Sequence, residues 1–470
     1  MSEVRRRVAG IALLIGLYLL IVYLVPKPEA VSPAGWRIFG LFVASVAGLV
    51  LEPVPGGAVV LIAVTLTPIL GGLTLAQALS GYADSTVWLV MAAFFISRAL
   101  INTGLARRIA LLFVRRFGTS SLGVCYALSM SEMVLATIIP SSGARAGGVV
   151  LPIVRSIAEL YGSRPGTTAR LLGAFLIITV YECVAISCAM FFTGQASNPL
   201  VAKMAAPTGF RVTWASWFMA GIIPGLCSIA LTPLLVLKLY PPEIRRTPEA
   251  AEFASKELAT MGPLSSKEWI LAVVFAGVCG MWITSDWHGV DITLTALLGS
   301  VSLLLANVLS WEDVKSERAG WDIFVWYGGL LMLGKALNDT KVPAEFANGI
   351  AGAFGSLGWP LLFAVALAIY FYSHYAFASI TAHVLAMYPP FLAILLAKQA
   401  PVGLIVFAFA CFANLSAGLT NYGTTPAPMF FAHEYVPLRD WWRIGFVVSL
   451  LNIAIWSTIG FGWWKLLGIW

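Results

Sequence analysis

Long apolar segments alternate with short polar ones along the whole chain. A helix that crosses a bilayer needs roughly 20 apolar residues. The segments that approach this length are 9–25, 36–51, 58–70, 171–192, 218–240, 269–283, 292–309, 360–372, 402–415 and 444–461. Two shorter segments, 87–99 and 323–333, each lead into a basic residue. The pattern predicts an all-α polytopic membrane protein with about eleven transmembrane helices and two re-entrant hairpins.

The first hairpin is predicted from residues 140–148 (PSSGARAGG), which lie between the apolar segments 122–139 and 149–157. This run is too short and too polar to span a bilayer. Non-helical backbone at membrane depth is tolerated only where protein or a water-filled cavity satisfies its polar groups, so such a tip usually lines a site. Arg145 adds a charge that costs about 2.5–3.5 kcal/mol near the bilayer centre. The candidate site residues of this tip are Ser141, Ser142, Gly143 and Arg145.

A second copy of the tip lies 238 positions further along, in residues 379–383 (SITAH). The same offset pairs Arg145 with His383 and Pro152 with Pro390. Matches that share one offset indicate an internal repeat, a common construction of secondary transporters. One cationic residue from each half therefore occupies the same place in its repeat. The candidate site residues of the second tip are Ser379, Thr381 and His383.

A helix break follows each hairpin, at residues 193–199 (TGQASNP) and 420–426 (TNYGTTP). Proline removes a backbone donor, and nearby hydroxyls and amides can replace the lost partners or bind a ligand. A proline kink with hydrogen-bonded hydroxyls is the simpler alternative. The matched pair favours two unwound helices that line a site. The candidate site residues of the breaks are Ser197, Asn198, Pro199, Thr424, Thr425 and Pro426.

Close packing of helices through small residues is the alternative for the first tip, since it accounts for Gly147 and Gly148. It does not account for Arg145 or for His383. Glu132 and Glu182 are acids within apolar segments. They are either carriers of protons or ions or members of structural ion pairs, and we leave them outside the predicted site.

The composition excludes an ordinary soluble domain, because 59% of the 470 residues are hydrophobic and only 11% are charged. The net charge of +7 does not indicate nucleic acid as a partner, since the basic residues gather in short loops, where they orient membrane proteins. The six cysteines lie in apolar segments without a Cys-x-x-Cys pair, and clustered metal ligands and nucleotide loops are absent from the sequence. No metal and no cofactor are therefore predicted.

The basic loops predict the orientation of the chain. Those at 5–7, 107–116, 155–170, 245–267, 315–318 and 439–443 are expected on the cytoplasmic side. The N-terminus is then cytoplasmic, in a bacterial or archaeal plasma membrane. The predicted units are an N-terminal helix (1–30), a first repeat with an inward hairpin (31–240), a cytoplasmic linker (241–268) and a second repeat with an outward hairpin (269–470). An odd number of spans in each half makes the second copy inverted.

Two opposed hairpins direct loop amides and half-helix N-termini at a shared centre, which favours an anion. Arg145 and His383 add two cationic points, and the hydroxyls of both tips can donate to carboxylate oxygens. This arrangement fits a small molecule with a carboxylate at each end.

The chain resembles the divalent anion/sodium symporters over nearly its whole length. The closer similarity is to the branch of plastid 2-oxoglutarate/malate translocators and bacterial citrate/succinate and tartrate/succinate antiporters. The segments that carry it are 80–88 (SGYADSTVW), 103–111 (TGLARRIAL), 140–148, 197–200 (SNPL) and 418–428 (GLTNYGTTPAP). The resemblance implies an elevator-type transporter, a homodimer in the lipid bilayer, whose transport domain carries substrate across a fixed scaffold.

The tips depart from the Ser-Asn-Thr pattern of that family, with Ser142 and Ile380 at the asparagine positions. Arg145 and His383 match cationic positions of the antiporter branch, where fixed charge stands in for bound sodium. The leading hypothesis is exchange of C4/C5 di- or tricarboxylates of the 2-oxoglutarate, malate, succinate, citrate or tartrate type. A sodium- or proton-coupled symporter is the alternative. A membrane enzyme is disfavoured because no nucleophile–base pair is evident, and a channel because the tips would block a pore.

Overall fold

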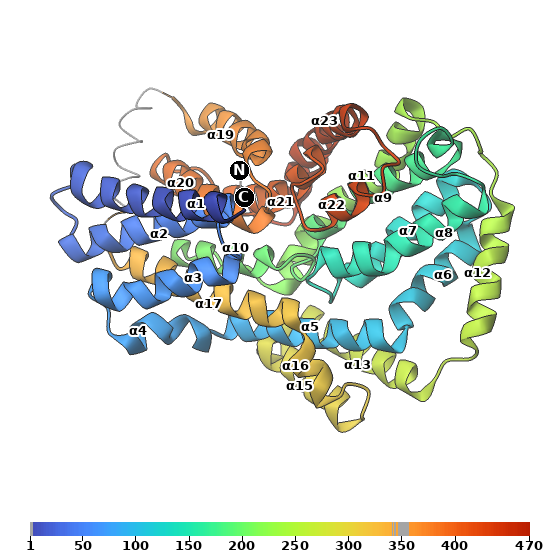
Figure 1. The fold of residues 1–470 in the computed structure, drawn as a ribbon, viewed down its shortest axis with the longest axis horizontal. Coiled ribbons are helices and arrows are strands. Elements are labelled where there is room, and N and C mark those ends of the chain that lie inside the picture. The colour runs from blue at the N-terminus through green and yellow to red at the C-terminus, as the bar shows by residue number, and fades with distance from the viewer. Residues whose placement is uncertain (1–2, 341, 343–344, 346–356) are drawn as a thin grey trace.

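Helices make up most of the chain that the computed structural model describes, namely residues 3–340, 342, 345 and 357–470 (Figure 1). Residues 1 and 2 of the predicted N-terminal helix lie outside this range. The helices are α1 Glu3–Leu19, α2 Pro33–Leu51, α3 Gly56–Leu66, α4 Leu75–Leu79, α5 Ser85–Thr103, α6 Leu105–Phe117, α7 Ser121–Ala136, α8 Leu151–Leu160, α9 Gly173–Met190, α10 Ser197–Ala205, α11 Trp214–Leu239, α12 Pro248–Met261, α13 Ser266–Ile283, α14 Ser285–His288, α15 Ile292–Leu305, α16 Trp311–Ser316, α17 Arg318–Asn338, α19 Trp359–Ser373, α20 Ile380–Ala397, α21 Val402–Leu415, α22 Pro426–Phe431, α23 Leu438–Ile455 and α24 Phe461–Leu466.

Among the described residues, 10 helical segments are long and apolar enough to cross a membrane. They include both arms of the second hairpin, whereas α7 and α15 are shorter apolar helices. The predicted class, an all-α polytopic membrane protein, is confirmed.

The first hairpin consists of α7, a non-helical turn, the π-helical segment η4 (Gly143–Val150) and α8. Its two ends meet the same segment of chain. Ser120 forms an isolated β-bridge with Arg246 at one end, and the Tyr161 hydroxyl donates to Glu249 Oε2 at 2.5 Å at the other. Because both ends are fixed at one place, the chain re-enters on the side from which it started, as predicted.

The second hairpin consists of α19, the short turn η7 (His374–Ala376) and α20, which pack against each other. A buried helix, a break, a short helix and a long helix follow each hairpin in the same order. In the first half these are α9, α10 and α11, and in the second half α21, α22 and α23. This order supports the predicted repeat, while the inversion of its second copy stays a prediction.

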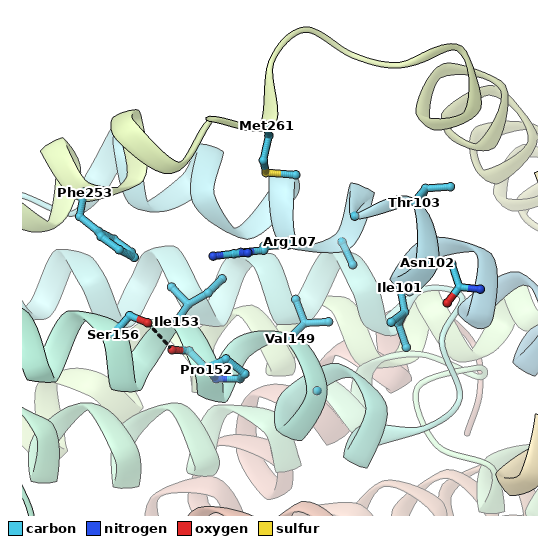
Figure 2. Close-up of a pocket in the computed structure, with 13 residues that line it drawn as sticks. Ile101, Asn102, Thr103, Arg107, Val149, Pro152, Ile153, Ser156, Phe253 and Met261 are labelled. Atoms are coloured by element: carbon cyan, nitrogen blue, oxygen red, sulfur yellow. Dashed lines mark hydrogen bonds between the residues drawn. The ribbon is translucent and has the colours of Figure 1, made fainter. Parts of the chain in front are cut away.

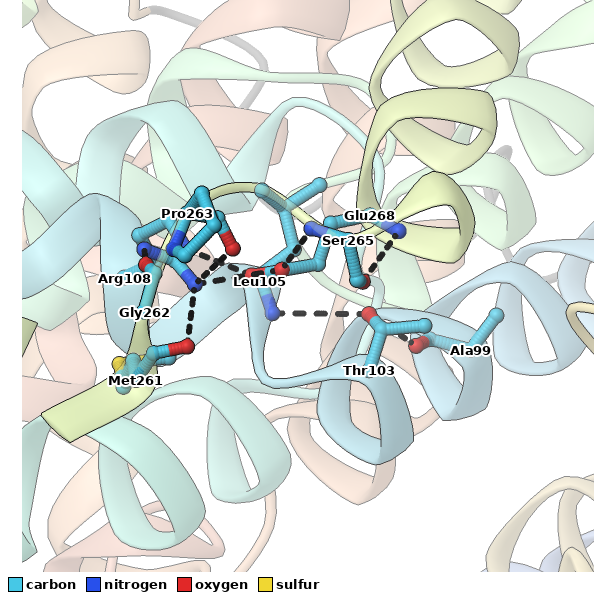
Figure 3. Close-up of polar contacts among 9 residues, drawn as sticks. All are labelled: Ala99, Thr103, Leu105, Arg108, Met261, Gly262, Pro263, Ser265 and Glu268. Carbon is cyan, nitrogen blue, oxygen red and sulfur yellow. Dashed lines mark hydrogen bonds and ion pairs between the residues drawn. The ribbon is translucent and has the colours of Figure 1, made fainter.

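The segment predicted as a linker, 241–268, contains the helix α12, which runs along one edge of the molecule and packs on α6 and α8 (Figure 1). Arg108 of α6 anchors its far end (Figure 3). The guanidinium donates to both carboxylate oxygens of Glu268, with Nε 2.6 Å from Oε1, and to the carbonyl of Gly262 at 2.9 Å. The linker is therefore a fixed strap between the two halves.

The helices that carry the breaks form the centre of the bundle. Every residue of α9 is buried, and 94% of the segment Val402–Leu419, which contains α21, is buried as well. The two helices pack against each other. Both breaks therefore begin inside the protein and away from lipid, where non-helical backbone can find partners.

Candidate functional site

The first tip lies where α7 ends at Ala136 and the π-helical segment begins at Gly143. Ser142 and Gly143 are buried, and Ser141 is partly buried. The Ser141 hydroxyl accepts a hydrogen bond from the backbone amide of Ala144 at 3.2 Å, which starts the second arm. The tip is therefore held in a turn that points its small residues into the protein.

Arg145 lies directly behind this turn and is completely buried. Its Nε donates to Glu132 Oε1 at 2.8 Å, and its Nη1 donates to the carbonyls of Ile139 and Gly194, the latter at 2.9 Å. Its Nη2 lies 3.4 Å from the sulfur of Cys188. One guanidinium thus joins both arms of the hairpin to the first break. Direct binding of substrate by Arg145 stays a prediction, and it requires the guanidinium to exchange these partners.

The first break is closed by amide side chains. Asn198 Nδ2 donates to the carbonyls of Cys188 and Phe191, both at 2.9 Å, so it replaces partners that the interrupted helix lacks. Asn198 Oδ1 accepts from Asn414 of α21 at 2.8 Å. This bond connects the first break to the helix that leads into the second. Pro199 is buried in the first turn of α10, where a missing backbone donor costs little.

The second break contacts the first tip. A Cβ atom added to Gly143 would lie 2.9 Å from Cγ2 of Thr425, so only glycine fits this approach without a shift. Thr424 is buried, Thr425 is exposed, and Pro426 begins α22. The Tyr181 hydroxyl of α9 donates to the carbonyl of Ala417 at 2.6 Å. The first tip, the first break and the second break therefore form one connected group.

The second tip joins this group through residues beside the predicted ones. His374 Nε2 lies 2.9 Å from the carbonyl of Gly423 in the second break. His383 is buried, with Nε2 2.9 Å from the carbonyl of Tyr370. Ser379 caps α20, and Thr381 is partly buried. Within the described chain, no hydrogen bond links Ser379 or Thr381 to the first tip.

Several buried polar atoms of the group have no hydrogen-bond partner in the described part of the chain. They are Ser197 Oγ, Thr420 Oγ1, Thr424 Oγ1, His374 Nδ1, His383 Nδ1 and Glu182 Oε1. Buried polar groups nearly always have partners, so a concentration of unpaired ones marks a place for ligand or water. The breaks and the second hairpin supply five of these atoms, and the sixth, Glu182 Oε1, belongs to α9.

Sequence reasoning left Glu132 outside the site, with a structural ion pair as one alternative, and missed two further partners of the site, Asn414 and Cys188. Glu132 pairs with Arg145, and its Oε1 also accepts from the Ser187 hydroxyl at 3.3 Å. Asn414 and Cys188 lie in apolar segments whose pattern gave no sign of a contact with a break. An acid 13 residues before a buried arginine was the available signal for Glu132.

A separate cleft of about 480 Å³ opens between the α5–α6 turn, the second arm of the hairpin and α12 (Figure 2). Its polar side chains are engaged elsewhere. Arg107 pairs with Glu257 at 2.5 Å, and Asn102 Nδ2 donates to Asp313 at 2.8 Å. The cleft borders the hairpin arm at Val149 but contains none of the predicted site residues.

Residues 6–470 match the family model described as the sodium:sulfate symporter transmembrane region. The chain is 43% identical over 453 residues to the putative malate transporter YflS of Bacillus subtilis, covering 96% of this chain and 95% of that protein. It is 39% identical over 455 residues to the chloroplastic dicarboxylate transporter 1 of Spinacia oleracea, covering 96% of this chain and 80% of that protein.

The fold is similar to the crystal structure of the YdaH transporter of Alcanivorax borkumensis, with a TM-score of 0.56 and 14% identity. That comparison covers 100% of this chain and 99% of the other. The family and these relatives are membrane transporters, not enzymes. Because the family model matches residues 6–470 of this chain, the chain belongs to the divalent anion/sodium symporters, the family of the sodium:sulfate symporter transmembrane region.

Proposed function

We propose that the protein exchanges C4/C5 di- or tricarboxylates across the plasma membrane by an elevator mechanism. The observation that carries the proposal is the connected group of the first tip and the two breaks, with its unpaired buried hydroxyls. Relatives named as malate and dicarboxylate transporters support the substrate class.

In this proposal the substrate carboxylates bind at the tips and breaks. Ser197 and Thr424 donate from their unpaired hydroxyls, and Ser141, Ser142, Ser379, Thr381 and Thr425 complete the ring of donors. The Nδ1 atom of His383 faces one carboxylate. Arg145 holds the first tip in position from behind, through Glu132 and Gly194.

The residues of the two tips favour exchange over coupling to sodium. Ser142 and Ile380 occupy positions at which the resemblance implies sodium-binding asparagines. A serine offers one oxygen and an isoleucine offers none, so two oxygen ligands suited to a hard cation are reduced to one. We further propose a homodimer, which the family resemblance implies. We also propose a cytoplasmic N-terminus, supported by the basic residues of the predicted cytoplasmic loops.

Counterflow into proteoliposomes tests the proposal. Purified protein is reconstituted into vesicles that contain unlabelled malate or no substrate, and uptake of labelled malate is followed in sodium or in choline medium. We expect uptake that requires internal malate and is unchanged when choline replaces sodium. Accumulation into empty vesicles that depends on a sodium gradient would favour the symporter and overturn exchange.

A further inference from the structure

Two carboxylates are buried on neighbouring helices, and only one of them has a charge partner in the described chain. Glu132 of α7 bonds to Arg145 and Ser187. Glu182 lies in the middle of α9 and is 2% exposed, and its Oε1 has no partner among the described residues. The two acids therefore differ in environment although both are buried in the same bundle.

Among the residues that the structure describes, none places a cation beside Glu182. The titratable groups of the described chain within electrostatic reach of its carboxylate are Tyr181, Cys183 and Tyr375, all neutral in their ordinary state. Other charged groups on elements packed against α9 have partners or are exposed: Glu132 with Arg145, Arg155 with Glu159, Arg170 with Tyr240, Asp440 with Arg443, and the exposed Lys238 and Arg439.

An unpaired carboxylate in such a place is strongly disfavoured. The cost of burying an isolated ion is so large that the group takes up a proton instead. Glu132 avoids this cost through the guanidinium of Arg145, whereas Glu182 avoids it only as a neutral carboxylic acid.

Glu182 also lies against the short helix that leads directly into the second break. A Cβ atom added to Gly418 would be 2.4 Å from Glu182 Oε2, so the carboxyl packs directly on the short helix η8 (Ser416–Leu419). The preceding residue, Tyr181, bonds to the carbonyls of Ala417 and Thr420 on either side of Gly418. Any rearrangement of the break during binding or release therefore changes the contact of Glu182 with water.

We propose that Glu182 is a proton-binding site of the transport cycle and must be protonated while the substrate site crosses the membrane. The inference rests on the proposed function of the second break. When the break opens to water, the O–H bond of Glu182 breaks and the proton passes to a water molecule, leaving a hydrated carboxylate. When the break closes, hydronium returns a proton to the carboxylate oxygen and water is released.

The first test compares pH profiles of malate counterflow in wild type, Glu182→Gln and the control Glu252→Gln, which changes an exposed glutamate of α12. Dividing the wild-type rate by the Glu182→Gln rate at each pH removes the titration of malate itself. As the pH rises we expect this quotient to fall, approaching about tenfold per pH unit once Glu182 releases its proton. Glu252→Gln should keep the wild-type slope. A flat quotient overturns the proposal, as does a folded Glu182→Gln protein that is inactive at every pH.

The second test needs no substrate. Infrared spectra of purified wild type at neutral pH should contain the C=O stretch of a buried carboxylic acid, which shifts in Glu182→Asp and is lost in Glu182→Gln. Absence of the band in wild type overturns the proposal even if a variant fails to fold. Absence of wild-type counterflow would instead refute dicarboxylate exchange, and the infrared result would still report the protonation of Glu182.

Discussion

Replacement of Glu132 by glutamine leaves the guanidinium of Arg145 buried without a counter-charge. Both side chains are inaccessible to solvent, and Arg145 Nε lies 2.8 Å from Glu132 Oε1. Removal of one member of such a pair typically costs about 3–5 kcal/mol of stability. Glu132→Gln should lie at the upper end, because a guanidinium cannot lose its proton in a protein. Arg145→Met should cost less, since Glu132 can then take up a proton.

The assay is a double-mutant cycle on the free energy of unfolding, measured by SDS titration in mixed micelles. The double variant Glu132→Gln/Arg145→Met should be more stable than the sum of the single effects predicts, by at least about 2 kcal/mol. The buried pair Arg108–Glu268, with Nε 2.6 Å from Oε1, is the matched control. Its variants should also lose stability but keep the substrate affinity, because this pair joins α6 to α13 outside the tips and breaks.

Direct binding of substrate by Arg145 predicts a different result. Arg145→Met would then lose substrate affinity by about two orders of magnitude or more, while Glu132→Gln would bind more tightly through its released cation. Two results together would make Arg145 a substrate ligand. The double-mutant cycle would give no coupling in the free energy of unfolding, and the substrate affinities would follow this second pattern. The assignment of Arg145 to holding the tip would then be refuted.

Three further outcomes are expected. Ser197→Ala should lower malate affinity about three- to tenfold in calorimetry, because its hydroxyl has no partner in the described chain, and the exposed Ser255→Ala on α12 is the control. Gly143→Ala should slow counterflow, because the added Cβ would lie 2.9 Å from Cγ2 of Thr425. Adding Thr425→Ser removes that methyl group and should restore the rate. A double variant as slow as Gly143→Ala would contradict this contact. A cysteine at Glu252 should react with an impermeant thiol reagent only after the cytoplasmic face is opened, and labelling of intact cells would disprove the orientation.

The positions of the tips and breaks could be predicted because each one interrupts an apolar segment of the sequence with proline, small or polar residues. An apolar run interrupted by Pro140 and small residues cannot continue as a spanning helix, and α7 ends at Ala136, shortly before that proline. The run 171–192 contains no interruption, and α9 accordingly extends over Gly173–Met190. Local pattern therefore determines where these helices begin and end.

The contacts between the tips and breaks could not be predicted, since they join segments far apart in the chain. The approach of Gly143 to Thr425 depends on how the two halves pack, and neither residue type is unusual in a turn. The strap helix α12 was also missed, because its mixed charges and flanking prolines resemble a solvated linker. It packs on α6 through its buried residues Ala250, Ala254 and Leu258, a tertiary contact that its own sequence does not reveal.

The proposed function sets one physical requirement for the charges within the bundle, which is that a dianion must cross the membrane without meeting an uncompensated negative charge. Glu132 meets this requirement because Arg145 neutralises it at 2.8 Å. Glu182 has no such partner in the described chain and meets the requirement only by protonation. The positive potential for the substrate must then come from donors that remain free, namely the hydroxyls of the breaks and the ring of His383. A site of this kind holds a dianion by many moderate hydrogen bonds, so the loss of any one hydroxyl should weaken binding severalfold and not abolish it.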